Sequence, residues 1–156
     1  MAGWGRKRRV LVAVIVAVPA LVLVWLGVEV VTFAISFSEM GSPQKAPCAE
    51  ALAFGGAKLP KEAHAAHCTV ETWLDTSYDA SFRMPREGVR DWLRAAYPHA
   101  PETDTEYCDD GVDLCLRLNG EGEHAPPAGA EADAVLVDVT YEGPDRALVR
   151  FMAFTV

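Results

Sequence analysis

The feature that most constrains this chain is an uncharged apolar stretch of 19 residues from Val10 to Val28. At about 1.5 Å per helical residue it would extend roughly 28 Å, which is close to the hydrocarbon thickness of a bilayer. Four basic residues precede it at positions 6–9, and none follows it directly. The positive-inside rule therefore predicts a membrane helix with its N-terminus in the cytoplasm and the rest of the chain outside.

A cleavable signal peptide is the alternative interpretation of the same stretch, because such signals also begin with basic residues. Their apolar region usually runs about 7 to 15 residues, and this one is longer. Small residues suited to a cleavage site occur only at Ala34 and Ser36, late in the segment. A retained anchor is therefore favoured, with secretion after cleavage as the alternative.

The predicted organisation has four parts. Residues 1–9 form a basic cytoplasmic tail, 10–36 a transmembrane signal-anchor helix, 37–47 a polar linker, and 48–156 an extracytoplasmic domain. We therefore expect a single-pass protein of the cell membrane, with the lipid bilayer as the partner of its N-terminal helix. From Phe37 onward there are ten Lys and Arg against 21 Asp and Glu. Such an acidic domain repels phosphate backbones, so no nucleic acid partner is expected.

All four cysteines follow the apolar stretch, where an oxidising compartment would let them form disulfides: Cys48, Cys68, Cys108 and Cys115. Four cysteines allow three pairings, and the sequence alone does not choose among them. Pairing the first with the second and the third with the fourth is favoured, because each pair then encloses a compact local segment. The first bridge would restrict the unfolded chain by about 3 kcal/mol.

Apolar periodicity in residues 48–156 predicts an α+β fold. The predicted elements are a short helix at 48–54, strands at 70–74 and 78–84, a helix within 85–98, a strand at 114–118 and two strands within 134–156. Their order predicts a small antiparallel sheet with the Trp92 helix packed on one side. The complete prediction is one N-terminal transmembrane helix followed by this disulfide-stabilised α+β domain.

A resemblance covers roughly Ala51 to Tyr97. The run AL.FGG..LP..A, followed by DTSYDASFRMPREGVRDWL, resembles a pattern in small exported or membrane-attached proteins of high-GC actinobacteria that are themselves uncharacterised. The resemblance implies an exported single-domain protein, and it carries no catalytic residues over to this chain.

Three arginines are the candidate partner-docking residues. Arg86, Arg90 and Arg94 recur every four residues and form a basic ridge on an acidic domain. They fit a solvent-facing stripe paired with Glu87 and Asp91. They also fit a surface that docks an acidic envelope protein or an anionic envelope polymer.

The sequence assigns no catalytic residue and no cofactor. A GxSxG elbow and a free Cys with a His partner are both missing, so nucleophilic catalysis has no support. Asp75 and Asp79 fit a carboxylate pair of the kind that hydrolyses glycosides, but an acidic domain forms such pairs by chance. A binding or scaffolding module at the cell envelope is therefore the leading interpretation, and an envelope enzyme that uses Asp and Glu residues is the alternative.

Two short motifs contain possible metal ligands. HAAHC at 64–68 places two His beside a Cys, but it has no CxxC partner and a disulfide-bonded Cys cannot bind zinc. DDGVD at 109–113 places oxygen ligands around a glycine, but it lacks the loop length and terminal Glu of an EF-hand. No metal site is predicted.

Overall fold

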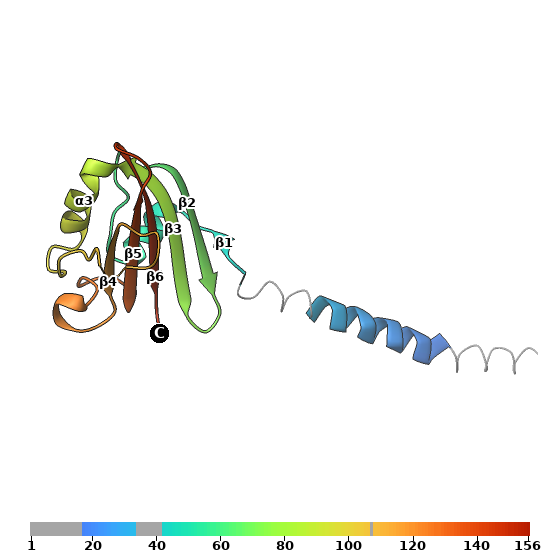
Figure 1. Cartoon of the computed structure of the whole chain (residues 1–156). Coiled ribbons are helices and arrows are strands. Elements are labelled where there is room, and N and C mark those ends of the chain that lie inside the picture. The colour runs from blue at the N-terminus through green and yellow to red at the C-terminus, as the bar shows by residue number, and fades with distance from the viewer. Residues whose placement is uncertain (1–16, 34–41, 107) are drawn as a thin grey trace, which may run out of the picture. The chain divides into compact units, whose positions relative to one another are not determined.

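The computed structural model describes residues 17–33, 42–106 and 108–156 (Figure 1). The contacts divide the chain into two compact units, with the boundary after residue 40. Each unit is described by itself.

In the first unit, residues 17–33 form a helix whose large apolar side chains are exposed. In the described ranges, no helix combines the length and the apolar character needed to cross a membrane. Residues 10–16 and 34–36 of the expected span, and the predicted basic tail at 1–9, lie outside those ranges. The predicted transmembrane helix is thus corrected.

The second unit is built on a six-stranded antiparallel sheet with strand order β1-β2-β3-β6-β5-β4 (Figure 1). The strands are β1 (Gln44–Lys45), β2 (His64–Thr72), β3 (Thr76–Pro85), β4 (Leu114–Leu118), β5 (Ala134–Tyr141) and β6 (Arg146–Phe154). This corrects the predicted small sheet. The edge strand β1 lies within residues 37–47.

Several short helices accompany the sheet, where one packed helix was predicted. They are α2 (Cys48–Phe54), η1 (Arg86–Gly88), α3 (Val89–Ala96) and η2 (Gly122–His124). Of these, α2 and α3 supply the buried apolar residues Ala51, Leu52, Val89 and Leu93. Both helices therefore join the core on the same side of the sheet.

Strict alternation along the strands gives the sheet one covered face. In β3, residues 78, 80, 82 and 84 are buried and their neighbours are not, and in β6 the same holds for 147, 149, 151 and 153. Because successive side chains of a strand point to opposite sides, all of these lie on one face. The buried residues of the described ranges include no polar or charged side chain.

Two tyrosines form hydrogen bonds with α2 and with the residue that follows it. Tyr78 Oη donates a hydrogen bond to Glu50 Oε1 over 2.6 Å, and Tyr97 Oη donates to the Gly55 carbonyl over 3.0 Å. The bond to Glu50 is the main cause that raises the pKa of Tyr78 to about 12. Burial alone raises the pKa of Tyr97. Both hydroxyls therefore stay protonated as donors at neutral pH.

Gly55 ends α2 in close contact with the sheet. A Cβ at this position would lie 2.6 Å from Cζ of Phe151 and 3.0 Å from Cβ of Ala153. The next residue, Gly56, has a φ of 78°, which side chains rarely adopt. The glycine pair therefore allows the helix to end against the covered face and the chain to turn away.

The opposite side of the sheet, called here the open face, carries the alternate residues of β2 to β6. A bulge between His64 and His67 sets the register in β2, and Ala65 there has a φ of 51°. After the bulge His67 lies opposite Ser81, and Thr69 lies opposite Asp79. The bulge therefore decides which side chains of β2 share the open face with β3.

The β2–β3 turn exposes two large apolar side chains. Trp73 is 67% exposed and Leu74 is 86% exposed. The alternation of Val70, Thr72 and Leu74 predicts that Leu74 continues a strand, whereas β2 ends at Thr72. That part of the prediction is wrong.

Candidate functional site

The arginine ridge, formed by Arg86, Arg90 and Arg94, runs along η1 and α3. The orientation of α3 is fixed from its other side, where Trp92 packs edge-on against Phe82 with 5.5 Å between ring centroids. Trp92 Nε1 also donates a hydrogen bond to the Lys58 carbonyl over 2.8 Å. With its apolar side held against the domain, α3 presents the arginines outward.

Arg86 is held by neutral groups. Its guanidinium carbon lies 3.8 Å from the centroid of the Tyr141 ring, and its Nη1 donates to the Gly143 carbonyl over 3.2 Å. A cation over an aromatic ring keeps its full charge. Arg86 is therefore positioned without being neutralised by a carboxylate.

Arg90 and Arg94 differ in their partners. Arg90 Nη1 donates to the hydroxyl of Thr103 over 3.2 Å, so its contact is also neutral. Arg94 forms an ion pair with Asp91 over 3.2 Å, but the two side chains are 77% and 80% exposed. Such exposed pairs contribute little because water screens them. The pairing with Asp91 that the sequence suggested therefore exists for Arg94, and no ion pair joins Glu87 to the ridge within the described residues.

Two hollows adjoin the ridge and share Arg90. One of about 510 Å³ is lined by Arg90 and Arg94 together with apolar residues that include Leu93, Tyr97 and Pro98. The other, of about 480 Å³, is lined by Arg86, Glu87, Arg90, Tyr141 and Pro144. The structure thus brings the three arginines to one continuous surface.

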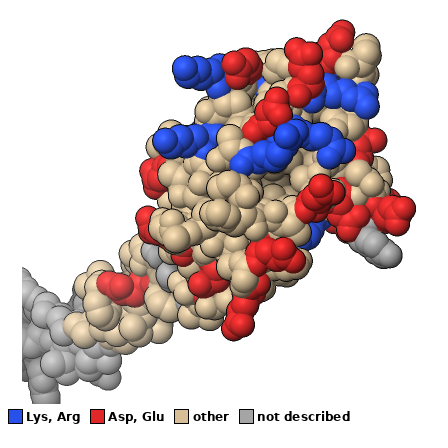
Figure 2. All heavy atoms as spheres, turned by 90° about the vertical axis from the view of Figure 1, so that its left-hand side faces the viewer, with Lys and Arg blue, Asp and Glu red and all other residues tan. Residues whose placement is uncertain are grey.

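The surroundings of the ridge are mixed in charge. Figure 2 shows basic side chains lying among acidic ones on the side of the domain that carries α3. Glu102 lines the larger hollow, and Glu87 lines the smaller one. The ridge is therefore a local concentration of positive charge bordered by acids, with apolar contact area inside the larger hollow.

All four cysteines are paired. The disulfides are Cys48–Cys68 and Cys108–Cys115, with Cα–Cα distances of 5.3 and 5.6 Å, and no cysteine is free. This is the pairing that local spacing favours. Cys68 is buried on the covered face opposite Ala80, whereas Cys115 lies opposite Asp138 on the other face.

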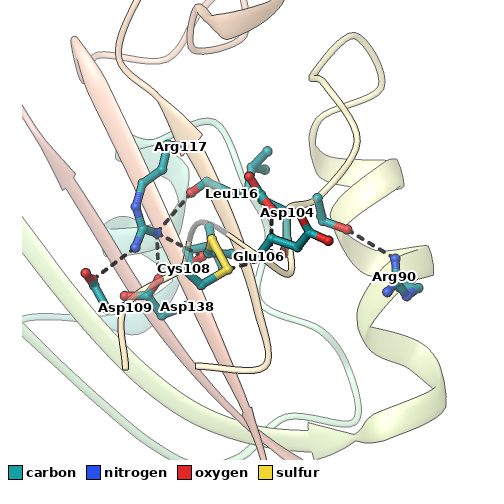
Figure 3. The surroundings of a disulfide bond; sticks show 11 residues. Arg90, Asp104, Glu106, Cys108, Asp109, Leu116, Arg117 and Asp138 are labelled. Atoms are coloured by element: carbon teal, nitrogen blue, oxygen red, sulfur yellow. Dashed lines mark hydrogen bonds and ion pairs between the residues drawn. A yellow bond between two sulfur atoms is a disulfide. The ribbon is translucent and has the colours of Figure 1, made fainter. Parts of the chain in front are cut away.

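The second disulfide holds an acidic loop beside an arginine that the sequence did not single out (Figure 3). Arg117 forms ion pairs with Asp138 over 2.6 Å and with Asp109 over 3.3 Å. It also donates to the carbonyls of Leu116 and Val137. Alternation in β4 places Arg117 on the face of Cys115, but only the register with β5 brings Asp138 beside it.

The structure places the other candidate residues as follows. Asp75 lies in the β2–β3 turn and Asp79 lies on the open face, so the structure does not present them as a carboxylate pair. His67 lies opposite Ser81, but no hydrogen bond joins them in the described ranges. No group of three His, Cys, Asp or Glu suited to a metal ion occurs among the described residues.

Comparisons with protein-family models, with curated proteins and with solved structures find no match to this chain.

Proposed function

We propose that residues 48–156 form a disulfide-stabilised binding module whose arginine ridge docks an acidic segment of another protein. The observation that carries this proposal is the pair of adjoining hollows lined by Arg86, Arg90 and Arg94. Among the described residues, Arg86 and Arg90 contact neutral groups and form no ion pair, so their charge is available to a ligand. Charge complementarity of this kind gives a surface its specificity and its association rate.

The lining favours an acidic peptide over a purely anionic polymer. Pro98, Ala100 and Pro101 give the larger hollow accessible apolar lining beside Arg90 and Arg94. Buried apolar anchors supply most of the affinity of protein contacts, whereas charges at the rim steer the encounter. A segment with one large apolar residue flanked by Glu or Asp matches both features.

The proposed compartment is outside the cytoplasm. Both disulfides are formed and no free thiol is left, which supports an oxidising environment. We expect native protein to show four alkylatable thiols only after reduction, measured as intact mass with and without a reducing agent. Thiols that react before reduction would contradict this placement.

The docking proposal is tested with a fluorescent peptide in which one Leu is flanked by Glu residues, using full-length protein. The variant Arg90→Gln/Arg94→Gln is expected to weaken binding at least about tenfold, because both charges at the larger hollow are lost. The matched control Lys45→Gln/Lys61→Gln removes the same charge outside the two hollows and should leave the dissociation constant within about twofold.

Two further measurements separate the outcomes. Binding should weaken as salt increases, because the contact is electrostatic at its rim. Inorganic polyphosphate should bind more weakly than the peptide, since it has no apolar group for the larger hollow. Equal losses in the ridge variant and the lysine control would contradict the proposal, and so would tighter binding of polyphosphate.

A further inference from the structure

A second hollow, of about 410 Å³, lies on the open face and is lined by residues of five strands and by Asp109. It is separate from the arginine ridge and shares none of its residues. Its lining combines charged side chains with the apolar side chains of Leu136 and Met152, and Met152 is 40% exposed.

Part of the charge in this hollow is already satisfied. Asp109 and Asp138 both contact Arg117, which makes further bonds to backbone carbonyls (Figure 3). The Cys108–Cys115 disulfide holds the loop that carries Asp109. These three charged groups therefore form one wall of the hollow, in which one arginine faces two carboxylates.

Asp79 and Arg150 are two opposite charges of the hollow that form no ion pair among the described residues. Asp79 lies opposite Met152, and Arg150 lies between Ser81 of β3 and Asp138 of β5. Because β3 and β6 are neighbours, Asp79 and Arg150 are diagonal on one face, with Cα atoms expected about 7 to 8 Å apart. Within the described ranges, neither side chain has a hydrogen bond or an ion pair in the structure.

The pKa of the Asp79 carboxyl agrees with the lack of an ion pair at this residue. Partial burial, and secondarily the charge of Glu71, raise the pKa of the Asp79 carboxyl. A carboxylate paired with a cation would instead have a lowered pKa. Asp79 is therefore a partly desolvated carboxylate that would gain from a positively charged ligand.

We propose that the open-face hollow binds a small zwitterion of the α-amino acid class with an apolar side chain. The ammonium group of the ligand contacts Asp79, its carboxylate contacts Arg150, and its side chain lies on Met152 and Leu136. Arginine suits this role, because its planar guanidinium accepts a carboxylate through two hydrogen bonds. An exposed site of this size should bind with a dissociation constant of about 1 mM or weaker.

The test uses L-leucine as the probe, titrated into full-length oxidised ¹⁵N-labelled protein and followed by NMR. Shifts are expected in the amides of β3 and β6 around Asp79 and Arg150. Two analogues separate the charges. N-acetyl-L-leucine has no ammonium and L-leucinamide has no carboxylate, and each should bind at least about tenfold more weakly than leucine.

Variants assign each charge to a residue. Asp79→Asn should remove the preference for leucine over N-acetyl-L-leucine, and Arg150→Gln should remove the preference for leucine over L-leucinamide. Both positions are exposed, so the spectra without ligand should show a folded protein. The matched controls Asp75→Asn and Arg146→Gln lie outside the hollow and should keep both preferences.

Three results would overturn the proposal. One is the absence of chemical-shift changes in the amides of β3 and β6 at a leucine concentration tenfold above about 1 mM. Another is equal binding of leucine and both analogues. The third is a direct Asp79–Arg150 ion pair, detected as a coupling energy in a double-mutant cycle that added leucine does not change.

Discussion

The two faces of the sheet are formed by the same strands but differ in burial and charge. On the covered face, β3 contributes Tyr78, Ala80, Phe82 and Met84, all of which are buried. On the open face the residues between them are partly or fully exposed. The covered face has mainly apolar packing, whereas the open face has charges, ion pairs and a hollow.

This difference separates the residues that stabilise the fold from those that line the proposed leucine site. A buried apolar side chain stabilises the fold by about 1.5 to 3 kcal/mol, whereas an exposed ion pair contributes at most about 1 kcal/mol. Charged residues on the open face can therefore change with little loss of stability. The following predictions test that separation, beginning with the largest expected effect.

Phe82→Ala should lower the free energy of unfolding by about 3 to 5 kcal/mol, because it leaves a cavity in the covered face and removes the contact with Trp92. On the open face, Met152→Ala should change it by about 0.5 kcal/mol or less. Chemical denaturation followed by circular dichroism measures both. A loss at Met152 as large as that at Phe82 would show that the open face is also part of the core.

The two disulfides extend the comparison, since Cys68 is on the covered face and Cys115 is on the open face. Cysteines 48 and 68 are 20 residues apart, and cysteines 108 and 115 are 7 apart. On the loop-entropy model, replacing the first pair by Ala should cost about 3 kcal/mol and replacing the second about 2 kcal/mol.

Denaturation of the two double variants measures this difference. Reduced wild-type protein is the control, because it loses both bridges without a change in side-chain volume. If removing the second bridge costs more than removing the first, loop entropy is not the main effect, and the loop at Asp109 contributes directly to the fold.

The smallest effect should come from the open-face ion pair of Arg83 and Glu142. Two hydrogen bonds of 2.8 and 2.9 Å join these side chains, and they are the main cause that lowers the pKa of Glu142. A lowered folded-state pKa contributes stability that is present above the unfolded value and is lost as the pH falls through the folded value. Wild type should therefore lose more stability than Glu142→Gln as the pH decreases below about 4.5.

Denaturation at a series of pH values between about 3 and 7 checks this sign. The matched control is Asp145→Asn, a nearby acid for which the structure gives no ion pair. Parallel pH profiles for wild type and Glu142→Gln would contradict the prediction.

Local pattern predicted several elements well. The helix at 48–54 and the strand at 114–118 coincide with α2 and β4, and the alternation of residues 78–84 correctly predicted β3. The predictions for these segments are correct because burial on one side of a helix or strand imposes a periodic spacing of apolar residues that can be read from the sequence. The predicted Trp92 helix is also confirmed, with η1 preceding it.

Features that depend on pairing were not predictable in the same way. The edge strand β1 is only two residues long, so no periodicity can reveal it. The bulge after His64 shifts the register by one position, and such a shift changes which side chains face each other. The ion pairs Arg117–Asp138 and Arg83–Glu142 likewise join residues that are far apart in the chain.

By itself, the sequence determined the disulfide-forming potential, most strand and helix positions, and the spacing of the arginine ridge, because each depends on residue type and local periodicity. Only the tertiary structure decided the strand order, the exposed Trp73–Leu74 turn and the hollow that contains Asp79 and Arg150. These depend on which segments pair. Pairing is set by the combined burial of all strands against α2 and α3, a property that no single stretch of sequence contains.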